Sequence, residues 1–205
     1  EIASYPLGIA AEAVKTVLSE AIAERALAEM IPPTMAEMAR RGMPYQDVLY
    51  AGLMIEDGAP RLVEYNVRFG DPECQVLMMR LGAQALDLMH AAADGRLAQA
   101  QVNWAEDHAV TVVMAAKGYP GDYDKGAVIG GLDALPETSS QMIFHAGTAL
   151  RDGAVIATGG RVLNVTARGT TLHDAVHGAY EMVDAIDFPG GFCRRDIGWR
   201  ALQAS

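Results

Sequence analysis

The sequence predicts an α+β protein made of two units. The first half combines helical periodicity with one pair of strand-like runs, whereas the second half holds short strand-like runs, glycine-rich turns and then one long helix. A polar stretch at residues 102–107 separates the two patterns. A length of 205 residues allows one or two domains. We therefore expect one unit at residues 19–105 and a second at residues 106–205.

The first half is expected to contain a helix, a hairpin and a second helix. Helical spacing runs from about residue 10 to residue 41, and we expect a break at the Pro-Pro pair inside it, because proline removes a helical hydrogen bond. Apolar runs at residues 47–55 and 60–69 are typical of strands, and the Asp-Gly pair between them favours a tight hairpin turn. Residues 75–93 are apolar at helical spacing and predict one helix.

The second half is expected to form a small α+β domain of mainly antiparallel strands. Four short apolar runs predict strands at residues 109–116, 142–147, 154–157 and 161–167. Apolar side chains then recur every three or four positions across residues 172–186, which predicts one long helix.

Composition and charge exclude several classes of function. The chain is 51% hydrophobic, enough for a buried core, and its formal net charge is -10. Such an acidic protein is a poor ligand for nucleic acid or an anionic membrane. No apolar run approaches the roughly 18 residues that span a bilayer, and no signal peptide is recognisable. Cys74 and Cys193 are too few for a disulfide framework. These features predict a cytoplasmic protein.

The end of the second hairpin strand, "VEYNVRFGDPECQ", concentrates polar groups. Side chains alternate between the faces of a strand, so Glu64, Asn66 and Arg68 are expected on one face. A carboxylate and an amide oxygen are hard ligands that suit Mg²⁺, and an arginine beside them suits phosphate. Magnesium, phosphate and arginine together are the equipment of phosphoryl transfer.

Two further acids follow this strand. Gly70 and Pro72 turn the chain and carry Asp71 and Glu73 to the end of the strand, where they could orient a small cationic or hydroxylated substrate. A charged strand end that is simply solvated explains the same pattern equally well, because short Glu-x-Asn matches are common by chance.

The motif "EYNVRFGDPECQ" resembles the signature of phosphoribosylamine–glycine ligases, also called glycinamide ribonucleotide synthetases, which are ATP-grasp enzymes of purine synthesis. Other segments resemble the same family in the same order, and the resemblance runs from about Ser19 to the end of the chain. They are "YAGLMI", "VVMAAKGYPGDY", "FHAGT", "GGRVLNVTA" and "FCRRDIGWRAL". A signature of a dozen residues with ordered companions is highly specific.

The resemblance implies a fold and a reaction. Residues 19–105 would be the C-terminal lobe of an ATP-grasp domain, and residues 106–205 a small C-terminal domain. In this family, ATP phosphorylates the carboxylate of glycine. The amine of 5-phosphoribosylamine then attacks the glycyl phosphate, which gives glycinamide ribonucleotide, ADP and phosphate.

The resemblance also assigns roles to residues. Glu64 and Asn66 would bind Mg²⁺ or Mn²⁺, and Arg68 would contact a phosphate of ATP or of the acyl phosphate. Asp71 and Glu73 would act with Arg68 in catalysis, as acids on the substrate side of the site.

The start of the chain differs from the family pattern. Residues 1–18 do not resemble the family and are expected to form an extension that is helical from about residue 10. The family's N-terminal domain and ATP-binding lobe have no counterpart here, so we expect no turnover by this chain alone.

The alternative function is a non-catalytic interaction module. The strand at residues 47–55 is apolar on both faces. A helix at residues 10–31, a second copy in a homodimer or the missing N-terminal half would cover it.

Histidines and a cysteine elsewhere give weaker signals. His145 lies in a strand pattern, and a packed or backbone-bonded histidine is the simpler explanation. His173 and His177 have the i,i+4 spacing that can hold zinc, but helix surface is favoured because no third ligand lies nearby in sequence. Cys74 has no neighbouring base to activate it as a nucleophile.

Overall fold

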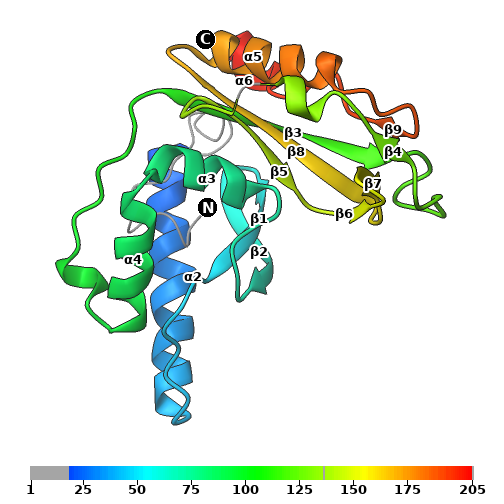
Figure 1. Ribbon diagram of the computed structural model, residues 1–205. Coiled ribbons are helices and arrows are strands. Elements are labelled where there is room, and N and C mark those ends of the chain that lie inside the picture. Colours follow the sequence, from blue (N-terminus) through cyan, green and yellow to red (C-terminus); the bar gives the residue numbers. More distant parts are fainter. Residues whose placement is uncertain (1–18, 136, 205) are drawn as a thin grey trace. The chain divides into compact units, whose positions relative to one another are not determined.

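The computed structural model describes residues 19–135 and 137–204, which form two compact units with a boundary between Ala105 and Glu106. Figure 1 shows the order of the helices and strands. Each unit is built on antiparallel strands of its own. Among the described residues, no helix is both long and apolar enough to cross a membrane.

Helix α2 (Glu20–Arg40) is continuous through Pro32 and Pro33, so the predicted break is wrong. Ser19 has an extended backbone, and its hydroxyl accepts a hydrogen bond from the backbone N–H of Ile22, which makes Ser19 the N-cap. The helix therefore begins at Glu20 and does not run on unbroken from residue 10. The expected helical segment before Ser19 lies outside the described residues.

Side-chain hydrogen bonds to the Met30 carbonyl and packing against the hairpin stabilise α2 near its two prolines. The Tyr65 hydroxyl donates to the Met30 carbonyl at 3.0 Å, and the Thr34 hydroxyl donates to the same carbonyl at 2.7 Å. A small apolar cluster surrounds them, made of Ala26, Leu27, Met30, Ile31, Ala51, Leu53 and Tyr65. An internal proline costs about 3 kcal/mol in a helix. These contacts offset part of that cost, which the sequence pattern of the helix alone does not reveal.

Strands β1 (Tyr50–Glu56) and β2 (Ala59–Asn66) form the predicted antiparallel hairpin. Asp57 and Gly58 have φ values of 50° and 72°, and positive φ at both positions is the geometry of a two-residue type I′ turn. Both strands differ from the predicted runs: β1 starts at Tyr50 rather than at residue 47, and β2 stops at Asn66 rather than at residue 69.

Two helices replace the single helix predicted at residues 75–93. Helix α3 (Glu73–Leu81) ends at Gly82, whose φ of 58° is unfavourable for residues other than glycine, and α4 (Gln84–Ala93) follows directly. The Gln46 side chain donates to the carbonyls of Ala92 and Ala93 and so satisfies the end of α4. A short 3₁₀ turn, η2 (Leu97–Gln99), completes the first unit.

The second unit holds two antiparallel sheets. The larger sheet has the order β5-β8-β3-β9 and the smaller sheet the order β4-β7-β6. The predicted strands are all present, whereas the shorter β4, β6 and β9 were not predicted. The strands are β3 (His108–Ala116), β4 (Val128–Ile129), β5 (Gln141–His145), β6 (Thr148–Arg151), β7 (Ala154–Ala157), β8 (Arg161–Gly169) and β9 (Gly191–Phe192).

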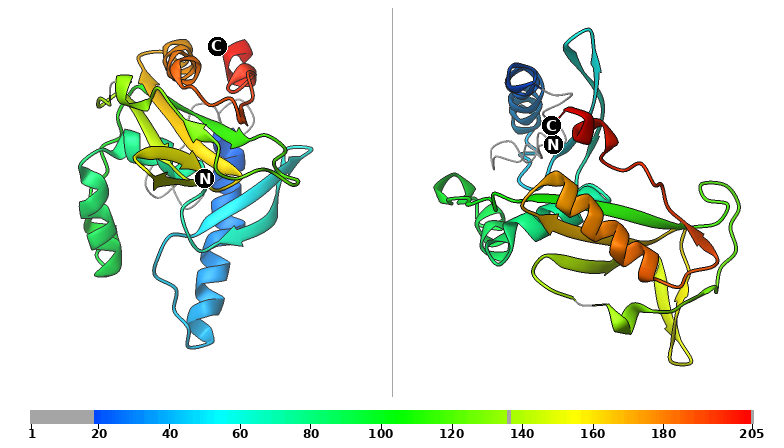
Figure 2. Two further views of the ribbon diagram at one scale, coloured as in Figure 1. Left: turned by 45° about the vertical axis from the view of Figure 1, so that its right-hand side comes forward. Right: turned by 90° about the horizontal axis from the view of Figure 1, so that it is seen from above.

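Helix α5 (Leu172–Ala185) covers one face of the larger sheet (Figures 1 and 2). Its N-terminus carries a capping box between Thr171 and Asp174. Leu163, Val165 and Ala167 of β8 are fully buried in the cluster that contains the α5 side chains Ala175, Ala179 and Val183. The predicted α+β unit of mainly antiparallel strands is thus confirmed. Two short helical segments, η3 (Leu132–Ala134) and α6 (Trp199–Ala204), complete it.

Candidate functional site

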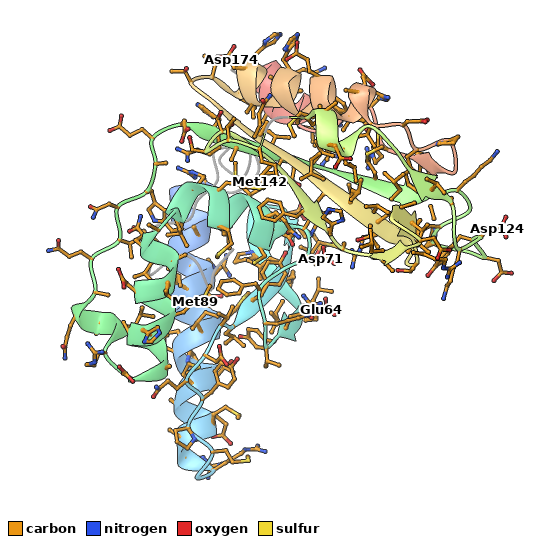
Figure 3. All side chains as sticks on the ribbon, viewed as in Figure 1. Glu64, Asp71, Met89, Asp124, Met142 and Asp174 are labelled. Carbon is orange, nitrogen blue, oxygen red and sulfur yellow. The ribbon has the colours of Figure 1, made fainter. Side chains whose placement is uncertain are left out.

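Glu64 and Asn66 lie in contact on one face of the hairpin. The Asn66 amide nitrogen Nδ2 donates to Glu64 Oε1 at 3.0 Å. Residues paired across the strands share a face, and Asn66 is paired with Tyr50 while Glu64 is paired with Gly52. The opposite face carries Ala51 and Tyr65, which pack against α2. The acid–amide pair therefore faces away from α2, and Figure 3 shows Glu64 on that side of the hairpin.

Gly52 leaves room for the Glu64 side chain. A Cβ atom placed on Gly52 would lie 3.4 Å from Glu64 Cγ, in van der Waals contact with the acid. The register shifts between Gly52, which pairs with Glu64, and Leu53, which pairs with Leu62. Val63 is therefore the extra residue of a β-bulge in β2. Bulges turn side chains locally, and this one directly precedes the acid.

Arg68 lies beyond the end of β2. The strand ends at Asn66, so the alternation that we expected to place Arg68 beside Glu64 does not extend to it. The guanidinium is exposed, and its Nη1 donates to the Phe69 carbonyl at 2.8 Å. The arginine is therefore near the pair along the chain, but its side-chain direction is set by a bend rather than by the strand.

Glu73 is held by a hydrogen bond from Tyr50 and lies in space left by Gly70. The Tyr50 hydroxyl donates to Glu73 Oε1 at 3.2 Å. The other oxygen lies over the bare backbone of Gly70, where an added Cβ would come within 2.3 Å of Glu73 Oε2. Glu73 is also the first residue of α3. The structure thus ties this acid to the face of the hairpin that carries Asn66, the cross-strand partner of Tyr50.

Asp71 is exposed and lies close enough to Cys74 to affect its titration. Burial is the main cause that raises the pKa of the Cys74 thiol, and the negative charge of Asp71 raises it further. Cys74 is therefore a neutral thiol at physiological pH, which agrees with the expectation that it is not a nucleophile. Figure 3 labels Asp71 above Glu64 in the first unit.

The weaker candidates have structural explanations. His145 is exposed, and its Nδ1 lies 2.9 Å from the Thr148 hydroxyl, so the expectation of a packed or backbone-bonded histidine is wrong. His173 and His177 lie on the exposed surface of α5 with stacked rings, and His177 Nδ1 lies 3.3 Å from Glu181 Oε2. The expected helix-surface role is confirmed for this pair.

The donor set of the acid–amide pair fits a hard divalent cation. Within the part of the chain that the structure describes, no group of three or more His, Cys, Asp or Glu residues could hold a metal ion. Mg²⁺ commonly takes only one or two carboxylates and completes its shell with water and phosphate oxygens. Rotation of the Asn66 amide would exchange Nδ2 for Oδ1 and give two oxygen donors at one place.

Sequence reasoning named Gly70 as part of the turn before Glu73 but missed the contacts of Tyr50 and Gly52 at this candidate site. Tyr50 and Glu73 are far apart in the chain, and no local pattern joins them. The pairing of Gly52 with Glu64 depends on the β-bulge, because a two-residue turn alone would place Gly52 opposite Val63.

Comparisons with known proteins show the family of the chain. Residues 7–74 match the family model "Phosphoribosylglycinamide synthetase, ATP-grasp (A) domain", and residues 109–200 match "Phosphoribosylglycinamide synthetase, C domain". The first match begins at residue 7, so it includes part of the segment 1–18 that we expected to be unlike the family.

Named relatives and a solved structure point the same way. A phosphoribosylamine–glycine ligase of Mesorhizobium japonicum is 53% identical over 195 residues, which is 95% of this chain and 46% of the relative. A chloroplastic ligase of that name from Arabidopsis thaliana is 48% identical over 200 residues, or 96% of this chain and 38% of the relative. A crystal structure of the Thermotoga maritima ligase is 34% identical with a TM-score of 0.71, and the match covers 93% of this chain and 44% of that one.

The fold and the match to an ATP-grasp domain model place the chain in the ATP-grasp class. The two family models together match more than half of the residues, and the chain belongs to the phosphoribosylglycinamide synthetase family. It spans a little under half the length of its bacterial relatives.

Proposed function

We propose that this chain supplies one wall of the active site of a phosphoribosylamine–glycine ligase of purine synthesis. The reaction joins glycine to 5-phosphoribosylamine through a glycyl phosphate, consumes ATP and releases glycinamide ribonucleotide, ADP and phosphate. The observation that carries the proposal is the contact between Glu64 and Asn66, on one open face of a hairpin within the ATP-grasp match.

Glu64 and Asn66 are the proposed ligands of Mg²⁺ or Mn²⁺. A divalent ion here would neutralise charge on the phosphates of ATP. Glu64 offers a carboxylate that accepts a hydrogen bond from Asn66, and the Asn66 amide needs only to rotate to present its oxygen. Gly52 lies directly opposite Glu64 and leaves space beside the acid.

Arg68, Asp71 and Glu73 are the proposed catalytic residues of this wall. The exposed Arg68 guanidinium donates a hydrogen bond to the neighbouring Phe69 carbonyl, and it can exchange this exposed contact for a phosphate or acyl phosphate at little cost. Asp71 and Glu73 present carboxylates near the end of the hairpin, where they suit the ammonium group of glycine or the hydroxyls of ribose. A cytoplasmic site of action fits these substrates.

An interaction module remains a second candidate, because apolar side chains in and just beyond the hairpin are open. Met54, Val63 and Val67 are 61%, 63% and 67% exposed. Large apolar side chains left open in this way can serve protein–protein contacts. A homodimer or a longer partner containing the remaining lobe would both cover them.

A chimera separates the two functions. Residues 19–205 of this chain would replace the matching segment of the Mesorhizobium japonicum relative, and ADP formation would be measured with and without glycine and 5-phosphoribosylamine. We expect ligation within about tenfold of the parent enzyme's kcat, because a tenfold change is only about 1.4 kcal/mol of barrier. A folded chimera that binds its substrates but makes no glycinamide ribonucleotide would contradict the proposed function.

A further inference from the structure

The contact between Tyr50 and Glu73 is not explained by any role assigned so far. Tyr50 is a β1 residue, Glu73 opens α3, and their part-buried hydrogen bond of 3.2 Å joins these two elements. We propose that Tyr50 is a positioning residue that holds the Glu73 carboxylate beside Glu64 and Asn66, where it accepts hydrogen bonds from water bound to the metal ion. This inference rests on the proposed function, because the metal site is itself proposed.

The register of the hairpin places Tyr50 at the acid–amide pair. Tyr50 lies directly opposite Asn66, and Cβ atoms of such cross-strand pairs are about 4.5–5.5 Å apart. Both side chains lie on the face away from α2, since Ala51 and Tyr65 occupy the α2 face. Tyr50 and Asn66 are therefore cross-strand neighbours on this face, and the hydrogen bond from the Tyr50 hydroxyl draws the Glu73 carboxylate toward the same face.

Gly70 leaves the space that the Glu73 carboxylate occupies. A Cβ atom on Gly70 would lie 2.3 Å from Glu73 Oε2 and 2.9 Å from Glu73 Cδ. A side chain at residue 70 would therefore push the carboxylate out of this position. The hydrogen bond from Tyr50 holds the carboxylate there through its other oxygen.

The chemistry favours an outer-sphere role for Glu73. Mg²⁺ keeps several of its water ligands, and acids around a site commonly bind those waters. Among the described residues no three acids, histidines or cysteines are grouped closely enough to hold one ion directly. A carboxylate near the Glu64–Asn66 pair is therefore suited to accept hydrogen bonds from the water ligands of the ion. Tyr50 orients Glu73 for this role.

The test uses Mn²⁺ as a probe in NMR spectra of the 205-residue chain. Bound Mn²⁺ broadens signals steeply with proximity, so Glu64, Asn66 and the Glu73 carboxylate carbon should all broaden. Tyr50→Phe removes one constraint on Glu73, and Gly70→Ala displaces the carboxylate by another route. In both variants we expect Glu73 to broaden less and the Mn²⁺ affinity read at Asn66 to fall about tenfold, as is usual when an outer-shell partner is lost.

Tyr45→Phe is the matched control. It removes another part-buried phenol hydrogen bond of the first unit, from Tyr45 to the Val48 carbonyl at 2.7 Å, without touching Glu73. It should leave the Mn²⁺ affinity unchanged. Broadening of Glu64 and Asn66 without Glu73, or an unchanged affinity in both variants, would overturn this inference alone. Absence of broadening at Glu64 and Asn66 would overturn the metal site and the inference together.

Discussion

Arg168 and Asp107 are joined by two parallel hydrogen bonds at one end of the larger sheet. Arg168 Nε donates to Asp107 Oδ2 at 2.8 Å, and Nη2 donates to Oδ1 at 2.9 Å. The two side chains are only 21% and 27% exposed. The pair thus joins the C-terminal end of β8 to the residue just before β3. Two parallel hydrogen bonds are the strong form of an arginine–carboxylate contact.

Asp107→Asn should destabilise the second unit by about 1–2 kcal/mol, since it weakens charge-assisted bonds in a largely buried place. Hydrogen exchange of the β3 and β8 amides measures this unit by itself. Asp196→Asn is the control, because the Arg194–Asp196 pair is also two-pronged but mostly exposed. An equal loss of protection in both variants would show that burial does not decide the strength of the Arg168 pair.

Tyr65→Phe should weaken α2 around its two prolines. The variant keeps the ring in the apolar cluster but removes the hydrogen bond to the Met30 carbonyl, at a cost of about 1 kcal/mol. Faster hydrogen exchange in the α2 turns that flank Pro32 and Pro33 would report the loss. If those amides keep their full protection, the helix tolerates the prolines for a reason other than its contact with β2.

The capping box of α5 makes the second unit sensitive to acid. The hydrogen bond from the Thr171 side chain, followed by that from the Thr171 backbone, lowers the pKa of Asp174 in the folded state. The unfolded pKa of an aspartate is about 3.9, so the stabilisation is fully present above that pH and is lost as the pH falls through the lower folded pKa. The stability difference between the natural chain and Asp174→Asn should therefore shrink below about pH 4. A difference that stays constant in acid would contradict this assignment.

The open apolar side chains of the hairpin region predict self-association. Met54 and Val63 are more than half exposed, and contiguous apolar surface beyond roughly 300–600 Å² is rare on soluble monomers. We expect a concentration-dependent homodimer by light scattering after size exclusion, and a shift toward monomer in Val63→Asp. A natural chain that stays monomeric at every concentration would remove the support for the interaction module.

The parts of the fold that local chemistry dictates could be predicted from the sequence. The hairpin follows from Asp57 and Gly58, because few other pairs adopt positive φ at both turn positions. Strand β8 and helix α5 follow from their apolar patterns. The continuity of α2 could not be predicted, since Tyr65 supports it from a different element. The division of α3 from α4 depends on one glycine whose conformation the apolar spacing conceals.

The candidate site was predictable where it follows a single strand and not where it depends on tertiary contacts. The contact of Glu64 with Asn66 follows from alternation along β2. The direction of Arg68 does not, because the strand ends two residues before it. The position of the Glu73 carboxylate depends on a hydrogen bond from Tyr50 of β1 and on the space that Gly70 leaves for it.

Turnover of the Asn66→Ala variant of the chimera tests the central claim most directly. If Asn66 and Glu64 together hold the metal, kcat should fall about a hundredfold or more, as when a preorganised electrostatic contact to the reacting group is removed. The melting temperature should not change, because Asn66 is only half-buried and its side chain donates an exposed hydrogen bond to Glu64. The control is Asn103→Ala, an exposed asparagine of the same unit, which should keep full activity. Unchanged ATP-dependent formation of glycinamide ribonucleotide by Asn66→Ala would contradict the account.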